Sequence, residues 1–146
     1  MAKKNSEDLY AQTERWLRSY PYWKKAVISL QRQYGLRAQA DAKVIATDTI
    51  TGGKTNKVHS TVEDLILNLE DIAERKNNLE AKIQLVESAM ELLTPVERKI
   101  IELRYFDRFS WWLVAAEVGY TDRHCKSIRT RVVHRLKAAI FGEDVE

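Results

Sequence analysis

The stretch that decides the fold lies in the carboxyl-terminal third, where residues 94–142 read TPVERKIIELRYFDRFSWWLVAAEVGYTDRHCKSIRTRVVHRLKAAIFG. Its first residues predict the start of a helix. The Thr94 side chain can accept a hydrogen bond from a free backbone N–H, and Glu97, three residues on, completes a capping box. Pro95 takes the first helical position, where its missing N–H costs nothing.

Two further helices are expected in the same stretch. Ser110 precedes a helix that should run to Val118, and Gly119 suits the left-handed turn beyond its end. Thr121 then caps a third helix, which is rich in Arg and Lys. Two short helices, a glycine-containing turn and a basic third helix are typical of helix-turn-helix proteins, whose recognition helix enters the major groove of DNA.

The third helix has an apolar and a polar face. Its inward stripe is Cys125, Ile128, Val132, Val133, Leu136 and Ile140, and the outward positions of its first turns are Asp122, Arg123, Lys126, Ser127 and Thr130. Arg and Lys can donate to guanine, and Ser and Thr to several base edges, so we expect these first turns to read bases. Phosphate contacts are expected from residues farther along or on the flanks, namely Arg129, Arg131, His134 and Arg135. A solvated basic face is the alternative.

Two adjacent tryptophans, Trp111 and Trp112, stand at the start of the second helix. Neighbouring helical positions are about 100° apart, so the two side chains cannot face the same side. One is expected to be partly exposed, or to pack on another element or on RNA polymerase. The alternative is that both cover the edges of a small core.

The amino-terminal part predicts two helices. The first should run from about Glu7 to Tyr20, and the second from about Tyr22 to Tyr34. Pro21 would start the second helix and Gly35 would end it, because both residue types disfavour a helix interior. Aromatic residues from both helices could join in one small core.

The least regular part is residues 36–60. Residues 44–50 have a strand-like composition, so a short hairpin or an ordered loop is expected, with disorder as the alternative. Gly52-Gly53-Lys54-Thr55 resembles part of a phosphate-binding loop, but the motif's first glycine would fall at Asp48. Nucleotide binding is therefore not expected, and the loop Gly52–Val58 has no assignable chemistry beyond a possible contact of its lysines with phosphate.

A seven-residue repeat runs without a break through residues 60–93. Its a positions are Val62, Leu69, Lys76, Ile83 and Met90, and its d positions are Leu65, Ile72, Leu79, Val86 and Leu93. This pattern predicts a long helix that forms a coiled coil between two copies of the chain. The dimerisation residues would be Leu65, Leu69, Ile72, Lys76, Leu79, Ile83 and Val86. The alternative is an amphipathic helix that packs on its own chain.

Composition limits the class of protein. Lys and Arg outnumber Asp and Glu by 11 to 5 in residues 1–60 and by 10 to 8 in residues 94–146, whereas acids lead by 8 to 3 in residues 61–93. Nucleic acid would therefore meet the two basic ends. A single cysteine and the lack of a long apolar run indicate a cytoplasmic protein without a membrane span. No zinc-ligand spacing and no nucleophile–base set is present, so neither a cofactor nor an enzymatic activity is expected.

Two stretches carry a resemblance to known families. Residues 93–106, together with Phe109-Ser110-Trp111, Gly119-Tyr120-Thr121 and Lys126-Ser127, resemble region four of bacterial σ factors. That domain reads the −35 promoter element and touches the polymerase flap. Residues 14–22, with Gly52–Val58 and Thr61-Val62-Glu63, look like the RinA/ArpU type of phage transcriptional activator. One departure is Trp112-Leu113, which replaces the polar pair usual after the tryptophan.

The resemblance implies a phage or prophage regulator of late or packaging operons in a Gram-positive host. It also implies recognition residues at Arg123, His124, Lys126, Ser127 and Thr130. Taken with Arg131 on the flank, these form the predicted DNA-binding set.

Together these observations predict an all-α protein of three parts. Residues 1–59 would form an amino-terminal helical pair with a basic loop, residues 60–93 a dimerisation helix, and residues 94–146 a DNA-binding domain. We expect a dimeric, sequence-specific activator that binds double-stranded promoter DNA, with host RNA polymerase as a candidate partner. Two alternatives are a ring-forming packaging protein, such as a small terminase subunit, and a module that holds RNA polymerase without reading DNA.

Overall fold

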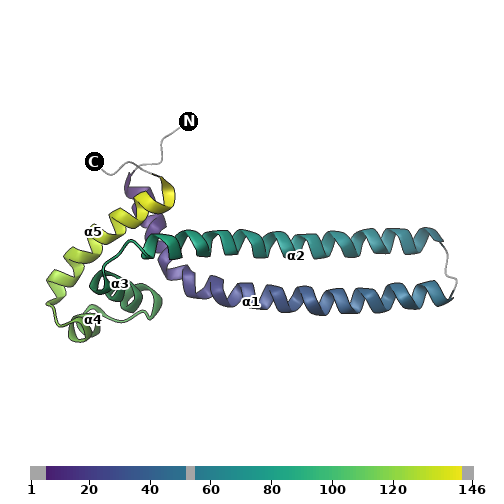
Figure 1. Cartoon of the computed structure of the whole chain (residues 1–146), viewed down its shortest axis with the longest axis horizontal. Helices are drawn as coiled ribbons and strands as arrows, with labels where there is room; N and C mark the ends of the chain where they lie inside the picture. Colours follow the sequence, from purple (N-terminus) through teal and green to yellow (C-terminus); the bar gives the residue numbers. More distant parts are fainter. Residues whose placement is uncertain (1–5, 52–54, 143–146) are drawn as a thin grey trace. The chain divides into compact units, whose positions relative to one another are not determined.

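The computed structural model describes residues 6–51 and 55–142, with side chains placed at 6–43, 46 and 62–142. Within these residues the protein is all-α, as predicted, and contains no strand (Figure 1). The elements in chain order are α1 (Ser6–Thr51), α2 (Thr55–Met90), α3 (Pro95–Ile101), the π-helical turn η1 (Glu102–Phe106), α4 (Trp111–Val118) and α5 (Asp122–Phe141). None of the described helices has the apolar length that a membrane span requires.

The chain divides into two compact units, and the amino-terminal end of α1 belongs to the same unit as the carboxyl-terminal helices. We call residues 6–22 together with 82–142 the head, and residues 23–51 together with 55–81 the arm. The predicted boundaries at 59/60 and 93/94 therefore do not separate the units. The sequence pattern could not indicate this, because the head joins segments that are about sixty residues apart.

The core of the head comes from every helix that enters it. Leu17 of α1, Val86 of α2, Ile100 of α3, Val114 of α4 and Val132 of α5 are all completely buried. Most of the buried apolar side chains lie between Leu93 and Ile140, and the turns of α1 and α2 add Leu17, Val86, Ala89 and Met90 to this core.

The helices α3, α4 and α5 of the head begin where the sequence predicts. The Thr94 hydroxyl accepts from the Glu97 N–H at 3.3 Å, and the Glu97 carboxylate accepts from the Thr94 N–H at 3.0 Å, which makes the predicted capping box. Ser110 and Thr121 cap α4 and α5 through their hydroxyl groups. Gly119 has the left-handed backbone expected beyond α4, with φ of 82°.

The prediction of two separate amino-terminal helices is wrong. α1 is one continuous helix from Ser6 to Thr51, with Pro21 and Gly35 in its interior. Pro21 costs about 3 kcal/mol in a helix interior. Packing on its amino-terminal side offsets this cost: Leu17 is fully buried and Tyr20 stacks on Phe106 with ring centroids 4.7 Å apart.

The strand or loop expected within residues 36–60 is also wrong for the described part. Residues 36–51 continue α1, and residues 55–60 are the first turns of α2. In the predicted Gly52–Val58 loop, Gly52–Lys54 lies outside the described residues, and Thr55–Val58 is helical. Strand propensity is a weak preference, and the helical context on both sides overrides it.

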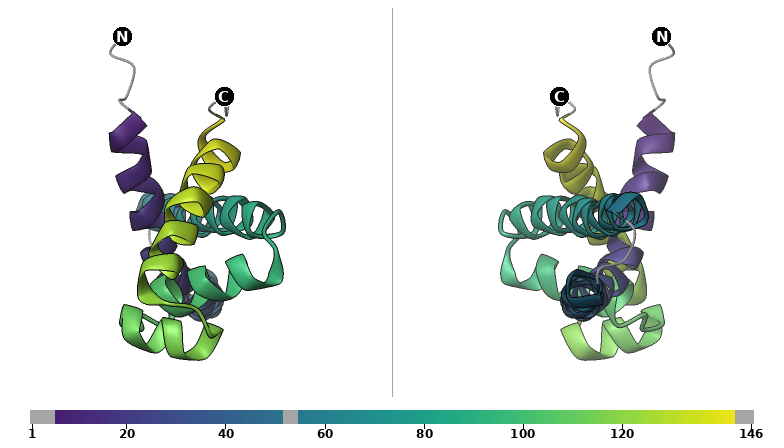
Figure 2. Two further views of the ribbon diagram at one scale, coloured as in Figure 1. Left: turned by 90° about the vertical axis from the view of Figure 1, so that its left-hand side faces the viewer. Right: turned by 90° about the vertical axis from the view of Figure 1, so that its right-hand side faces the viewer.

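The arm consists of α1 and α2 lying side by side and antiparallel (Figures 1 and 2). Five of the predicted dimerisation residues, Leu65, Leu69, Ile72, Lys76 and Leu79, are half-buried on the arm. Ile83 is half-buried in the head, and Val86 is completely buried in the head core. Val86 therefore cannot be part of a seam between two chains, and the alternative of a helix that packs on its own chain describes this end of α2.

Candidate nucleic-acid interface

The predicted DNA-binding residues form one open face on the first turns of α5. All six are exposed: Arg123, His124, Lys126, Ser127, Thr130 and Arg131. The Thr130 hydroxyl donates to the Lys126 carbonyl at 3.0 Å, which leaves its lone pairs available to accept. The face thus combines three fixed cations with hydroxyl groups and an imidazole, the donor and acceptor types that contact base edges and phosphates.

The opposite face of α5 holds the helix in the head. All six predicted apolar positions are buried: Cys125, Ile128, Val132, Val133, Leu136 and Ile140. Burial raises the pKa of the Cys125 thiol, and the nearby Asp122 carboxylate adds to the shift. Cys125 is therefore a small core residue, and its thiol stays protonated.

Arg129 does not reach toward solvent as predicted. Its guanidinium lies 4.9 Å from the centroid of the Trp111 ring and 3.8 Å from the Glu14 carboxylate. Glu14 also accepts a hydrogen bond from the Tyr105 hydroxyl at 2.7 Å. Arg104 lies over the same Trp111 ring at 4.8 Å. The prediction that Arg129 contacts phosphate is therefore corrected: this residue ties α5 to α1, η1 and α4.

The carboxyl-terminal half of α5 is also occupied by intramolecular contacts. Arg135 pairs with Glu97 of α3. Lys137 is buried and donates to the Ser6 hydroxyl at 2.7 Å, and the His134 ring packs 4.9 Å from the Tyr10 ring. Arg135 and His134 are thus engaged by the head itself. Of the flanking residues predicted to contact phosphate, Arg131 has the most open position.

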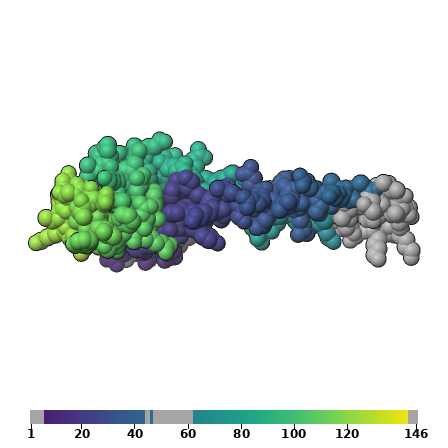
Figure 3. Space-filling model, turned by 90° about the horizontal axis from the view of Figure 1, so that it is seen from below, coloured from purple at the N-terminus to yellow at the C-terminus, as the bar shows by residue number. Residues whose placement is uncertain are grey.

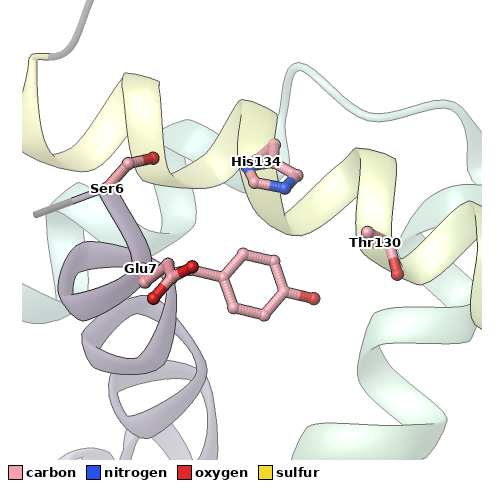
Figure 4. Close-up of a pocket in the computed structure, with 5 residues that line it drawn as sticks. Ser6, Glu7, Thr130 and His134 are labelled. Carbon is pink, nitrogen blue, oxygen red and sulfur yellow. The ribbon is translucent and has the colours of Figure 1, made fainter.

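A cavity of about 230 Å³ lies where the first turns of α1 meet α5, and Figure 4 shows its lining. Ser6 and Glu7 enter it from α1, and Thr130 and His134 enter it from α5. The Glu7 carboxylate makes this corner unfavourable for a phosphate. The surface suited to nucleic acid therefore extends from Arg123 to about Thr130 and ends where α1 begins to cover α5.

The two adjacent tryptophans have different environments. Trp111 is half-buried between the arginines described above, whereas the Trp112 side chain is 71% exposed. The expectation that one of the pair is exposed is confirmed. Leu113 and Tyr120 are also exposed, and the Tyr120 ring meets His124 edge to face at 4.8 Å. Exposed apolar side chains thus stand on α4 and in the turn before α5, and one of them, Tyr120, contacts the open face of α5 at His124.

Several residues that hold the interface were not found from sequence. Glu14, Tyr105 and Tyr10 set the position of α5, and Arg98 donates to the Met90 carbonyl at 3.1 Å. Glu14 lies 91 residues before its partner Tyr105, so no local pattern connects them. The one available signal was the family resemblance of residues 14–22, which begins at Glu14. It drew attention to this segment but did not indicate its contacts.

One known protein family matches nearly the whole chain. Residues 14–138 match a family described as "Protein of unknown function (DUF722)". The chain belongs to this family. The matched part of this DUF722 protein runs from Glu14, at the centre of the contacts above, to Ala138 in the last turns of α5. No curated protein and no solved structure matches the chain.

Proposed function

We propose that this protein is a sequence-specific DNA-binding transcriptional activator. The observation that carries the proposal is the open face of α5, where Arg123, Lys126 and Ser127 project from a helix that is capped by Thr121 and buried along its other side. In a helix-turn-helix protein this is the part of the recognition helix that meets base edges.

The charge of the interface supports an anionic ligand such as DNA. Arg123, Lys126 and Arg131 lie within nine residues, and Asp122 at the helix start is favourable for the helix dipole. Arg and Lys at this spacing can combine donation to guanine with neutralisation of phosphates. Binding should therefore weaken as the salt concentration rises.

The biological setting follows from the resemblance to region four of σ factors and to RinA/ArpU-type activators. On that basis the protein switches on late or packaging genes of a phage in the cytoplasm of its bacterial host. It binds double-stranded promoter DNA as a dimer, and so recognises two related half-sites.

The test is selection of bound fragments from the source genome at physiological salt. Wild-type protein should enrich one short intergenic site, and Arg123→Ala/Lys126→Ala should lose that enrichment. Arg15→Ala/Lys99→Ala is a matched control, because it removes the same charges from exposed positions outside α5. Uniform weak capture by wild type and both variants would refute base reading by α5.

A module that binds RNA polymerase without reading DNA is the second candidate. The exposed apolar side chains of Trp112 and Leu113, which are neighbours on α4, favour it, because large exposed apolar groups mark protein-binding surfaces. In that case Trp112→Ala would abolish capture of the polymerase, and DNA would be bound weakly and equally at all sequences.

A further inference from the structure

Arg108 has a backbone conformation that most side chains disfavour. It lies in the connection from η1 to α4, and in the part of the chain that the structure describes it is the one residue other than glycine with a positive φ, of 57°. In this left-handed region the Cβ of an L-residue crowds the following carbonyl oxygen, so glycine and asparagine are the usual occupants. Arginine is therefore an unfavourable residue for the backbone at this position.

Hydrogen bonds on both sides of Arg108 impose this conformation. The N–H groups of Asp107 and Phe109 each donate to a carbonyl of η1 at 2.9 Å. The Arg104 guanidinium donates to the Phe109 carbonyl, also at 2.9 Å. None of these bonds uses the Arg108 side chain. The fold therefore explains why the chain turns at residue 108, but it does not explain why the residue is an arginine.

The Arg108 side chain is exposed and makes no hydrogen bond, ion pair or ring contact within the described residues, although Asp107 precedes it directly. Two nearby arginines differ from it, because Arg104 and Arg129 lie 4.8 and 4.9 Å from the centroid of the Trp111 ring. Residues that keep an unfavourable backbone conformation cluster at functional sites. Arg108 combines such a conformation with a guanidinium that is available to an external anion.

The place of Arg108 in the head indicates which anion it meets. Trp111, three residues further on, contacts Arg129 of α5, and three extended residues span about 10 Å. In Figure 3 the segment from η1 to α4 (green) lies on the surface beside the first turns of α5 (yellow-green). In helix-turn-helix complexes the helix before the recognition helix crosses the DNA backbone. A cation just before α4 is therefore placed near phosphates.

We propose that Arg108 binds a backbone phosphate of the DNA whose bases α5 reads. A guanidinium suits this contact, because its N–H groups match the geometry of phosphate oxygens. Hydrogen bonds already fix the backbone at Arg108, so binding needs to order only its side chain. A phosphate contact outside α5 also helps to set the orientation of the recognition helix in the groove. This inference rests on the proposed function and adds a contact residue to it.

Two substitutions separate the side chain of Arg108 from its backbone. Arg108→Ala removes the charge and keeps a Cβ in the left-handed region, whereas Arg108→Gly removes both the charge and the strain. Each should weaken binding to the fragment that wild type enriches by about tenfold at low salt. Each should also reduce the slope of log affinity against log salt by about one. Arg108→Gly should nevertheless unfold at a higher temperature than Arg108→Ala, so weaker binding cannot result from a less stable fold.

Two further variants are controls. Arg108→Lys retains the charge and should keep most of the affinity. Lys99→Ala removes one charge from an exposed position of α3 and should change neither the affinity nor the salt slope. The base preference should be the same in wild type and in every Arg108 variant, because a phosphate contact carries no sequence information directly.

Ethylation of single phosphates would locate the contact. An ethyl group neutralises one phosphate and blocks one of its oxygens, so ethylation at the phosphate that Arg108 contacts should weaken binding by wild type. The same ethylation should leave the affinity of Arg108→Gly unchanged, because this variant has no guanidinium at that position.

Unchanged affinity and salt slope in both Arg108→Ala and Arg108→Gly would overturn the inference. An altered base preference would also overturn it, because Arg108 would then contact a base edge. Normal DNA binding with lost capture of RNA polymerase would assign the guanidinium to an acidic protein surface instead. If wild type captures all fragments equally, base reading by α5 is refuted, and the salt slope on a random duplex still tests the phosphate contact of Arg108.

Discussion

Glu14 connects three side chains that are distant from one another in the sequence. Its carboxylate accepts from the Tyr105 hydroxyl at 2.7 Å, and it lies 3.8 Å from Arg129 and 3.6 Å from Arg18. Burial raises the pKa of Tyr105, so its hydroxyl stays a donor at neutral pH. The single carboxylate thus holds α5 in place through Arg129.

Removing this carboxylate should destabilise the head. Glu14→Ala leaves the Tyr105 hydroxyl and the Arg129 guanidinium without their shared acceptor, at a cost of about 1–3 kcal/mol. Glu14→Gln should recover part of this loss, because its amide oxygen can still accept from Tyr105. Urea unfolding followed by circular dichroism would measure both, with Glu117→Gln, an exposed residue of α4, as the control. Equal stability of Glu14→Ala and wild type would show that the network contributes nothing.

Two arginines of α5 should have different effects on binding. Arg123→Ala should relax the preference at one base pair by about 1–3 kcal/mol. Arg131→Ala should weaken binding to all sequences similarly and reduce the slope of log affinity against log salt by about one. A binding-site selection combined with a salt titration separates the two. The same profile for both variants would contradict the assignment of Arg123 to bases.

The capping box of α3 should make stability depend on pH. Burial alone would raise the pKa of Glu97, but hydrogen bonds from Thr94 and Arg135 outweigh it and lower the pKa below its ordinary value of 4.5. A carboxylate with a lowered pKa stabilises the fold above its unfolded pKa, and that contribution disappears as the pH falls through the folded pKa. The free energy of unfolding should therefore fall below about pH 4.5, and Glu97→Gln should show a smaller fall over the same range.

At the level of single residues, sequence periodicity could predict which positions of α5 point outward. It could not predict which of them remain available. Arg129 and Lys137 are engaged by α1, and Arg135 is engaged by α3, so their partners lie outside any local pattern. The predicted DNA-binding residues are open because the first turns of α5 extend beyond these contacts. They are Arg123, His124, Lys126, Ser127, Thr130 and Arg131.

At the level of elements, the helix ends that depend on neighbouring residues were predicted well. The continuity of α1, which depends on contacts with distant residues, was not predicted. The caps of these helices are hydrogen bonds to backbone groups within four residues, so they follow from the sequence. The capping residues are Thr94, Ser110, Thr121 and Gly119. Pro21 and Gly35 disfavour a helix locally, yet α1 passes through both. Contacts of Leu17 and Tyr20 with distant residues decide that outcome, and local propensity does not contain them.

Two glycines should respond in opposite directions to the same substitution. Gly35 lies inside α1 with no atom within 4 Å of an added Cβ, so Gly35→Ala should stabilise the protein by about 0.5–1 kcal/mol. Gly119 has φ of 82°, so Gly119→Ala should destabilise it by about 1–2 kcal/mol. Thermal unfolding monitored at 222 nm would compare them. Destabilisation by Gly35→Ala would indicate that α1 is not continuous there.

At the scale of the whole molecule, the head is assembled from both ends of the described chain, and the arm is inserted between them. Composition and periodicity established the all-α class, but the heptad pattern alone could not distinguish a partner helix in a second chain from one in the same chain. Once α1 continues to Thr51, the same stripe has a neighbour in its own chain.

This arrangement predicts the behaviour of two shortened proteins. A fragment of residues 94–146 lacks Leu17 and Val86 and should not unfold cooperatively. A chain in which a short flexible linker replaces residues 23–81 retains the head and should bind the selected site as a monomer. Calorimetry and mass measurement would test both. A stably folded 94–146 fragment would show that α1 is dispensable for the folding of α3, α4 and α5.

The joining of Ser6–Tyr22 with the last sixty residues has a consequence for synthesis on the ribosome. The amino-terminal turns emerge first, yet their partners in α3, η1 and α5 are translated last. The antiparallel arm is made of neighbouring segments, so it can form while translation continues and bring the two halves of the head together before that unit closes. Nascent chains stalled before residue 94 should therefore expose Leu17 and Trp16 to chaperones, and protection of these residues should begin only when α5 has left the exit tunnel.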